Sequence, residues 1–250
     1  GLLMAAPYAT ADVVVRVDGT LVSVPYVDMT MAVMRAFGAK PTASASYQKI
    51  DVPTTSRYQA THYEIEPDGS AASYFFAAAA VVGGCVRVAG LTRQSLQGDV
   101  RFCDCLEQMG CQIDYADDHI AVSSDGKLVG IDVDMNAISD TVQTLAVVAL
   151  FAKGRTRIRN VGHIRHKETD RIAATAAELR KFGADVTETD DGLEIAPGTL
   201  RGATIDTYND HRMAMSFAIA GLRVPGVVIN DPACTEKTYP GFFNDLAQLS

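Results

Sequence analysis

The sequence repeats itself about every 72 residues, and this period constrains the fold more than any other feature. Three helix-like segments end in glycine at nearly the same interval: Gly38, Gly110 and Gly183, which are 72 and 73 residues apart. A fixed period of this kind reports the architecture of a chain before any single residue does. The sequence therefore predicts a fold assembled from several copies of one structural unit.

A second series with the same period supplies the rest of the unit. In it, an apolar helix is followed by a glycine-containing turn and a β-branched strand, at residues 74–88, 145–159 and 213–229. An alternating hairpin follows Gly183, and Asp191 and Gly192 mark its turn. Each unit therefore reads as helix, strand, helix, strand and strand, a combination expected to form a small α/β sandwich with its neighbours.

The repeat is incomplete at both ends of the printed sequence. The first copy begins on a helix at residues 2–6, and the last copy stops after a helix at residues 242–249 without its hairpin. The first residue is Gly1 rather than methionine. We expect both ends to be cut within the repeating architecture, with the missing strands supplied by other residues or by another chain.

The composition favours an ordinary globular protein and excludes some partners. The chain is 48% hydrophobic and carries a formal net charge of −8, which disfavours nucleic acid and anionic membranes. A nucleic-acid end-processing enzyme built on similar units is disfavoured for the same reason. The five cysteines are odd in number and form no Cys-x-x-Cys pair, as expected in a reducing cytoplasm. The longest apolar helices, at residues 71–82 and 141–152, are shorter than the roughly 18 residues that span a bilayer.

Basic residues cluster where helices are expected to begin, at residues 165–171, 209–213 and 234–238. In the first cluster, the spacing predicts that Lys167, Glu168 and Arg171 share one helical face. Cations in a first turn oppose the helix dipole, whereas a bound anion would be held by the cations and the backbone N–H groups together. The alternative for any one cluster is a solvated charged face. Three clusters at related repeat positions favour an anion site.

Four strings carry a family resemblance: residues 68–75 (DGSAASYF), 165–171 (RHKETDR), 208–215 (YNDHRMAM) and 231–238 (DPACTEKT). In order and spacing they resemble the C-terminal motifs of the EPSP synthase (3-phosphoshikimate 1-carboxyvinyltransferase) family. The resemblance implies an α/β (α+β) fold of repeated βαβαββ units in two lobes, truncated at the N-terminus. Residues 1–66 would be the remainder of the N-terminal lobe and residues 67–250 the C-terminal lobe.

The resemblance also implies a reaction, in which the enolpyruvyl group of phosphoenolpyruvate is transferred to the 5-hydroxyl of shikimate 3-phosphate and phosphate is released. The implied catalytic residues are Asp140 at the attacking hydroxyl, Glu168 as the acid at the methylene, and Lys237. The implied substrate-binding residues are Ser23, Tyr26, His163, Lys167, Arg171, His211 and Arg212. No metal and no organic cofactor is required. An acid, a base and fixed cations over the leaving phosphate are what such an addition needs.

Simpler explanations exist for several of these residues. Asp140 precedes an apolar helix and could be its N-cap, and Ser23 and Tyr26 could be ordinary turn and helix-start residues. Glu168 could simply form a surface ion pair with Arg171 and have no catalytic role. His163 stands where the family usually has an asparagine. His163 and His166 are three residues apart, but a zinc site there would need further Cys, His or carboxylate ligands.

The chain lacks several elements of the family pattern: its N-terminal Lys-Ser pair, its Asn-x-Gly-Thr loop, an arginine for phosphoenolpyruvate and its Ser-Ser-Gln string. We therefore expect little or no turnover from this chain alone, and a partnership with the missing N-terminal segment as a separate chain. Two alternatives remain open at this point. One is a UDP-N-acetylglucosamine enolpyruvyl transferase, and the other is a non-catalytic complementation fragment.

Overall fold

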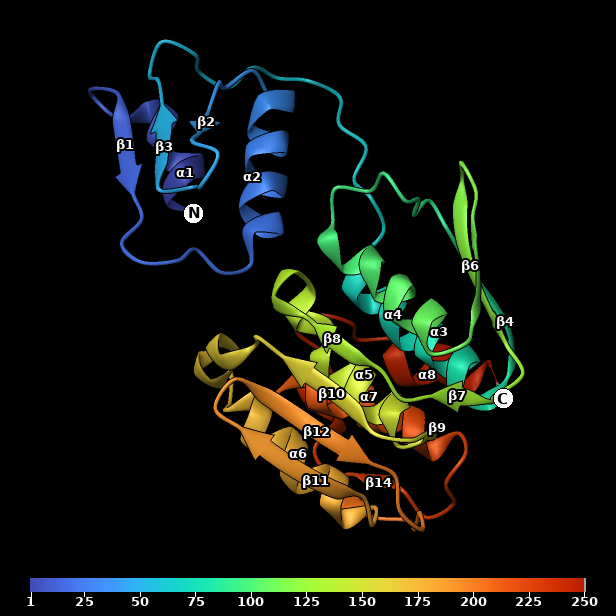
Figure 1. Ribbon diagram of the computed structural model, residues 1–250. Helices are drawn as coiled ribbons and strands as arrows, with labels where there is room; N and C mark the ends of the chain where they lie inside the picture. Colours follow the sequence, from blue (N-terminus) through green and yellow to red (C-terminus); the bar gives the residue numbers. More distant parts are fainter. Residues whose placement is uncertain (250) are drawn as a thin grey trace. The chain divides into compact units, whose positions relative to one another are not determined.

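The computed structural model describes residues 1–249, which form two compact units (Figure 1). Unit 1 contains residues 1–66 and 94–98, and unit 2 contains residues 67–93 and the chain from residue 99 onward. Each unit has its own hydrophobic core. In the part of the chain that the structure describes, no helix has the length and apolar character needed to cross a membrane.

Unit 1 consists of a small antiparallel sheet and two α-helices. Its elements are α1 (Leu2–Ala5), η1 (Ala6–Tyr8), β1 (Val13–Arg16), α2 (Val24–Ala36), β2 (Thr42–Ala43) and β3 (Lys49–Val52). The strand order is β1-β3-β2. The helix expected at the start of the chain is confirmed as α1, and the buried residues Met31 and Met34 of α2 belong to the core of the unit.

Unit 2 contains most of the helices and strands. Its helical segments are α3 (Gly69–Val82), η2 (Gly98–Arg101, whose first residue belongs to unit 1), α4 (Phe102–Gln108), η3 (Asn136–Thr141), α5 (Val142–Ala149), η4 (Gly162–His166), α6 (Arg171–Lys181), α7 (His211–Gly221), η5 (Pro232–Thr235) and α8 (Phe242–Ala247). Its strands are β4 (Gly84–Ala89), β5 (Gln112–Tyr115), β6 (His119–Ser124), β7 (Leu128–Val129), β8 (Asp132–Asp134), β9 (Ala152–Lys153), β10 (Thr156–Arg159), β11 (Asp185–Thr189), β12 (Gly192–Ala196), β13 (Thr204–Ile205) and β14 (Val228–Ile229).

The sheets of unit 2 confirm the sequence repeat. One sheet has the order β4-β6-β5, and the next has the order β11-β12-β10-β8. In both, the strand that follows the apolar helix pairs with the second strand of the hairpin, and all of these pairings are antiparallel. The second sheet adds β8, which runs parallel to β10. The expected α/β architecture of repeated units is therefore observed.

The glycines that define the period end helices as expected. Gly38, Gly110 and Gly183 all have positive φ, between +94° and +109°, a conformation that glycine adopts without steric cost. At Gly183 an added Cβ would also lie 2.7 Å from the backbone oxygen of Thr199. A side chain is therefore excluded at Gly183 by both backbone conformation and space.

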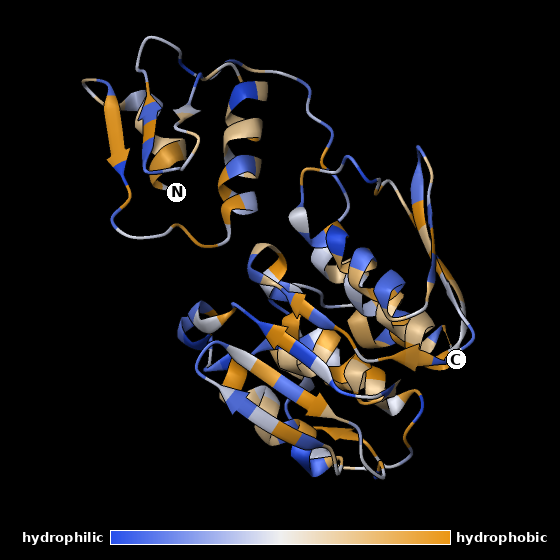
Figure 2. Ribbon diagram, in the orientation of Figure 1, coloured by the Kyte–Doolittle hydropathy of each residue, from blue (hydrophilic) through white to orange (hydrophobic). Residues whose placement is uncertain are grey.

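Apolar helices fill the interior of unit 2, between sheets that lie outside them. Every residue of α5 is buried, and α5 packs against α3, α6 and α7 (Figure 1). Orange and tan stretches mark these helices in Figure 2. Cys103 and Cys105 of α4 are buried, and burial raises the pKa of both thiols.

The packing predicts a large effect of one core substitution. Phe182 is fully buried at the end of α6 and stacks on Phe217 of α7, with ring centroids 6.1 Å apart. Phe182→Ala should lower the free energy of unfolding by about 3–5 kcal/mol, because the lost contacts leave a cavity. Val82→Ala, at a side chain 54% exposed at the end of α3, is the control and should change it by less than about 0.5 kcal/mol. Urea denaturation measures both, and equal effects would contradict the assignment of the core.

Candidate functional site

The predicted cationic side chains of unit 2 meet around three acidic side chains: Asp140, Glu168 and Asp210. Arg171 is the first residue of α6, Arg212 is the second residue of α7, and Lys237 lies just after η5. They come from segments far apart in sequence. All three belong to one unit, so the folding of that unit is sufficient to bring them together.

Arg171 is the centre of the cluster. Its side chain is only 1% exposed, and it donates hydrogen bonds to three carboxylates: Nη1 to Asp140 at 3.0 Å, Nη2 to Glu168 at 2.6 Å and Nε to Asp210 at 2.8 Å. A buried charge is tolerated when its donors are matched in this way. Arg171 therefore fixes the positions of three acidic side chains.

The other cations lie beside the same carboxylates. Arg212 Nη2 donates to Asp140 at 2.8 Å, while Lys167 Nζ lies 3.7 Å from Asp140 and Lys237 Nζ lies 3.9 Å from Glu168. The two arginines are buried or nearly so, whereas the side chains of Lys167 and Lys237 are 36% and 50% exposed. The cluster therefore holds four cations against the three carboxylates that Arg171 binds, with the lysines on its solvent side.

One expectation about this region is wrong. Lys167 and Glu168 do not lie on a helix with Arg171, because Lys167 has ψ −146° and α6 begins only at Arg171. Asp170 sets that start, since its carboxylate accepts hydrogen bonds from the backbone N–H groups of Ile172 and Ala173. The capping carboxylate starts the helix too late to include Lys167, yet Glu168 still reaches Arg171.

The N-capping alternative for Asp140 is also wrong. Asp140 lies inside η3, and the N-cap position of α5 is Thr141, which makes no side-chain capping bond. The Asp140 carboxylate accepts from Arg171 and Arg212 instead. Asp210, by contrast, caps α7 through the backbone N–H of Arg212.

Two histidines border the cluster. His163 lies in η4, and burial, followed by the charge of Lys167, lowers its pKa. His211 is the buried first residue of α7, and burial, followed by the charge of Arg212, lowers its pKa. Both imidazoles therefore favour the neutral form near pH 7. Among residues 1–249, no group of three or more His, Cys, Asp or Glu side chains is arranged to hold a metal ion.

Two residues of the cluster were not among the predicted site residues. Asp210 is fully buried and binds Arg171, and Tyr74 of α3 lies with its hydroxyl 3.5 Å from Arg212 Nη1. Burial raises the pKa of Tyr74 to about 12. Both lie in strings that carry the family resemblance, which was the available signal. Ser23 and Tyr26 belong to unit 1, at the N-cap position and in the first turn of α2, and their binding roles remain predictions.

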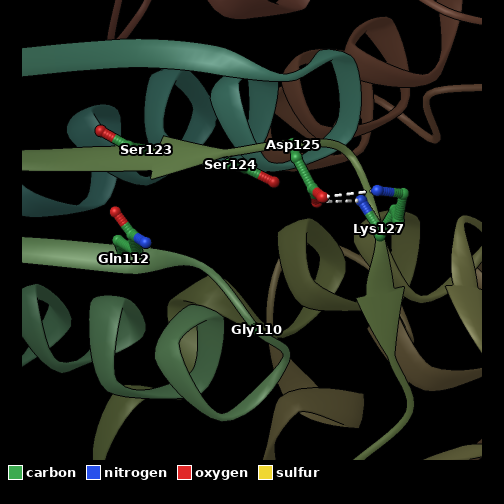
Figure 3. A pocket seen from close by; sticks show the side chains of 6 residues that line it. All are labelled: Gly110, Gln112, Ser123, Ser124, Asp125 and Lys127. Atoms are coloured by element: carbon green, nitrogen blue, oxygen red, sulfur yellow. Dashed lines mark hydrogen bonds and ion pairs between the residues drawn. The ribbon is translucent and has the colours of Figure 1, made fainter.

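A separate polar pocket of about 500 Å³ lies in unit 2 around β5 and β6, lined by Gly110, Gln112, Ser123, Ser124, Asp125 and Lys127 (Figure 3). The Asp125 carboxylate turns toward Lys127 and accepts from its Nζ at 2.8 Å and from its backbone N–H at 2.9 Å. This lysine is already neutralised, so the pocket has no counterpart of the four-cation cluster.

The architecture is that of the enolpyruvyl transferases. An EPSP synthase structure from Acinetobacter baumannii superposes with a TM-score of 0.80 at 24% identity, over 99% of this chain and 58% of that one. The sequence profile of EPSP synthase (3-phosphoshikimate 1-carboxyvinyltransferase) matches residues 1–246. The chain belongs to the EPSP synthase family.

Relatives with the name 3-phosphoshikimate 1-carboxyvinyltransferase support this membership. The protein of Nostoc punctiforme is 54% identical over 248 residues, and that of Photobacterium profundum is 51% identical over 250 residues. Each match covers 99% of this chain and 58% of the relative. The chain therefore spans less than two thirds of the length of these relatives. None of these names favours the UDP-N-acetylglucosamine enolpyruvyl transferase alternative.

The geometry predicts that Arg171 stabilises the fold as well as the site. Arg171→Met should lower the free energy of unfolding by about 3–5 kcal/mol, because it leaves buried carboxylates without their shared cation. Arg157→Met is the matched control, since Arg157 also pairs with two carboxylates but is 52% exposed, and it should cost about 1 kcal/mol or less. Urea unfolding near pH 7 measures both. Equal losses would contradict a special role for the buried guanidinium.

The lowered pKa of His163 predicts a pH dependence of stability. Because the unfolded chain binds a proton near pH 6.5 more readily than the folded chain, the contribution of His163 is complete above that pH and is lost as pH falls through the lowered pKa. His163→Asn should therefore reduce the loss of stability between about pH 7.5 and 5. His166→Asn, at an exposed imidazole of the same 3-10 helix, is the matched control. Equal pH slopes in the wild type and in His163→Asn would contradict the lowered pKa.

Proposed function

We propose that unit 2 supplies the phosphoenolpyruvate-binding part of a 3-phosphoshikimate 1-carboxyvinyltransferase. The observation that carries the proposal is the gathering of Lys167, Arg171, Arg212 and Lys237 around Asp140 and Glu168 within one unit. Phosphoenolpyruvate carries a carboxylate and a phosphate on one small carbon frame. A cluster with planar guanidiniums and mobile ammonium groups matches both anions.

In the proposed reaction the acidic residues transfer protons and the cations stabilise negative charge. Glu168, 35% exposed, delivers a proton to the methylene carbon of phosphoenolpyruvate, and Asp140 accepts the proton of the attacking hydroxyl. The new C–O bond forms a tetrahedral adduct, in which the former methylene is a methyl group. In the second step Glu168 takes a proton back from that methyl group, the enolpyruvyl double bond re-forms, and the C–O bond to phosphate breaks while the proton held by Asp140 passes to the departing phosphate. Arg171, Arg212 and Lys237 stabilise the negative charge on the carboxylate and on the departing phosphate. None of these steps requires a metal or an organic cofactor.

The acceptor in this proposal is shikimate 3-phosphate. The family resemblance assigns the binding of its phosphate to Ser23, Tyr26 and His163, and the contact with its ring to Lys167. His211 supports Arg212 at the phosphoenolpyruvate site. We also propose a cytoplasmic location, in keeping with five cysteines that form no disulfide.

The proposal assigns the complete activity to the longer enzyme. This chain corresponds to 58% of the length of its relatives and carries neither the Lys-Ser pair nor the Asn-x-Gly-Thr loop of the family. Catalytic groups that lack their positioning partners lose much of their rate advantage. The N-terminal part, supplied as a separate chain, is therefore the proposed partner.

Mixing tests the proposal directly. We expect the chain to release phosphate at least about 100-fold faster when the remaining N-terminal part of the Nostoc punctiforme relative is added, and only with both phosphoenolpyruvate and shikimate 3-phosphate present. UDP-N-acetylglucosamine should not replace the acceptor. Phosphate release assays measure the rate, and calorimetry measures association of the two parts.

Variants provide the controls for this experiment. Arg212→Met should abolish the restored release, whereas Arg157→Met, on the exposed face of β10, should retain it. Association without turnover would leave the complementation-fragment alternative. If the two parts show no association and no turnover, both the split-enzyme and the docking interpretations are removed.

A further inference from the structure

We infer that Glu178 is a positioning residue that holds the start of α7, and with it Arg212, in place for anion binding. Glu178 lies near the C-terminal end of α6, and its side chain is fully buried. The proposed chemistry leaves this carboxylate without a role. The inference rests on the proposed function only where it concerns the ligand, because the positioning itself is a property of the fold.

Each carboxylate oxygen of Glu178 accepts a hydrogen bond from the segment before α7. Oε1 accepts a hydrogen bond from the hydroxyl of Tyr208 at 2.8 Å, and Oε2 accepts one from the backbone N–H of Asp206 at 3.1 Å. Burial, followed by the bond to Glu178, raises the pKa of Tyr208 to about 12, so its hydroxyl remains a donor. Lys181 Nζ lies 2.7 Å from Glu178 and neutralises it, while also binding Asp206 at 2.8 Å.

The segment that Glu178 holds is strained. Tyr208 and Asn209 both have φ +55°, and neither is glycine. A left-handed conformation is unfavourable for a residue other than glycine and persists only where surrounding contacts determine it. The next residue is Asp210, which caps α7 through the N–H of Arg212 and binds Arg171. We call residues 206–210 the turn before α7. If Tyr208 and Asn209 relaxed to ordinary backbone conformations, the capping residue Asp210 and the first residues of α7 would move.

One face of α6 holds both ends of this turn. Arg171 and Glu178 are seven residues apart, close to two helical turns, so their side chains project from the same side of α6. Arg171 binds Asp210 at one end of the turn, and Glu178 binds Asp206 and Tyr208 at the other. The orientation of Arg212 in the cluster thus depends on a carboxylate two turns further along the helix.

The test uses Glu178→Gln and Tyr208→Phe in the full chain. The substitution Glu178→Gln keeps the shape of the side chain, but its amide NH2 group faces the N–H and O–H donors that the carboxylate accepted from. The substitution Tyr208→Phe removes only the hydroxyl. We expect hydrogen exchange of the amides of residues 206–212 to accelerate about ten-fold in Glu178→Gln and about three-fold in Tyr208→Phe. Phosphoenolpyruvate binding, followed by calorimetry, should weaken by similar factors.

Glu194→Gln is the matched control. Glu194 lies on β12, pairs with Arg155 and Arg157, and has no contact with the turn among those described, so this variant should keep both exchange and affinity. The double variant Glu178→Gln with Tyr208→Phe should be less than additive, because the two changes remove one shared hydrogen bond.

The outcomes separate the inference from the proposed function. Faster exchange at residues 206–212 together with weaker phosphoenolpyruvate binding supports the inference. Unchanged exchange, or unchanged affinity beside a lowered melting temperature, overturns it and leaves Glu178 a purely structural residue. If the wild-type chain does not bind phosphoenolpyruvate, the proposed function fails, and the exchange measurement alone decides whether Glu178 holds the turn. Tyr208→Phe keeps the test decisive if Glu178→Gln does not fold.

Discussion

The organisation of unit 2 depends on one guanidinium buried among carboxylates. Arg171 is 1% exposed, and a charge at that depth is stable only when its donors are matched by anionic partners. Its partners Asp140, Glu168 and Asp210 come from η3, from the segment before α6 and from the N-cap of α7. One side chain therefore joins three segments that the sequence keeps far apart, and the cations of the site are arranged around that junction.

The repeat explains why these segments meet. Asp140 and Arg212 are hydrogen-bonded and 72 residues apart, and so are Thr144 and Ser216, whose hydroxyls lie 3.2 Å apart in the core. Each pair thus joins positions one period apart, on or just before α5 and α7. Equivalent helix starts converge in the middle of the unit, and their caps and first-turn side chains converge with them. The fold therefore creates a charged centre from residues that need no proximity in sequence.

Local sequence rules predicted much of this fold and part of the site. Glycines at the helix ends and the Asp-Gly hairpin depend on the conformations of single residues, so the sequence alone was sufficient to predict them. The cationic strings also predicted which basic residues would meet. Spacing failed at Lys167 and Glu168, because the carboxylate of Asp170 begins α6 later than charge spacing suggests. At Asp140 it was the N-cap alternative that failed, because the N-cap position of α5 is Thr141 and the Asp140 carboxylate accepts from two arginines of distant segments. Tertiary contacts of this kind have no local signal, and Glu178 was missed for the same reason.

The site combines fixed and adjustable cations. Arg171 and Arg212 make hydrogen bonds of 2.6–3.0 Å to carboxylates, so their guanidiniums are held in place before a ligand arrives. The Nζ atoms of Lys167 and Lys237 lie 3.7 and 3.9 Å from their carboxylates, and their side chains are 36% and 50% exposed. Both lysines can therefore reorient on their flexible stems. In the proposed function, a dianionic ligand meets a fixed pair of guanidiniums on the buried side and two more exposed ammonium groups on the solvent side. Because the carboxylates already neutralise most of this charge, the cost of assembling four cations is met by the fold itself, before any ligand binds.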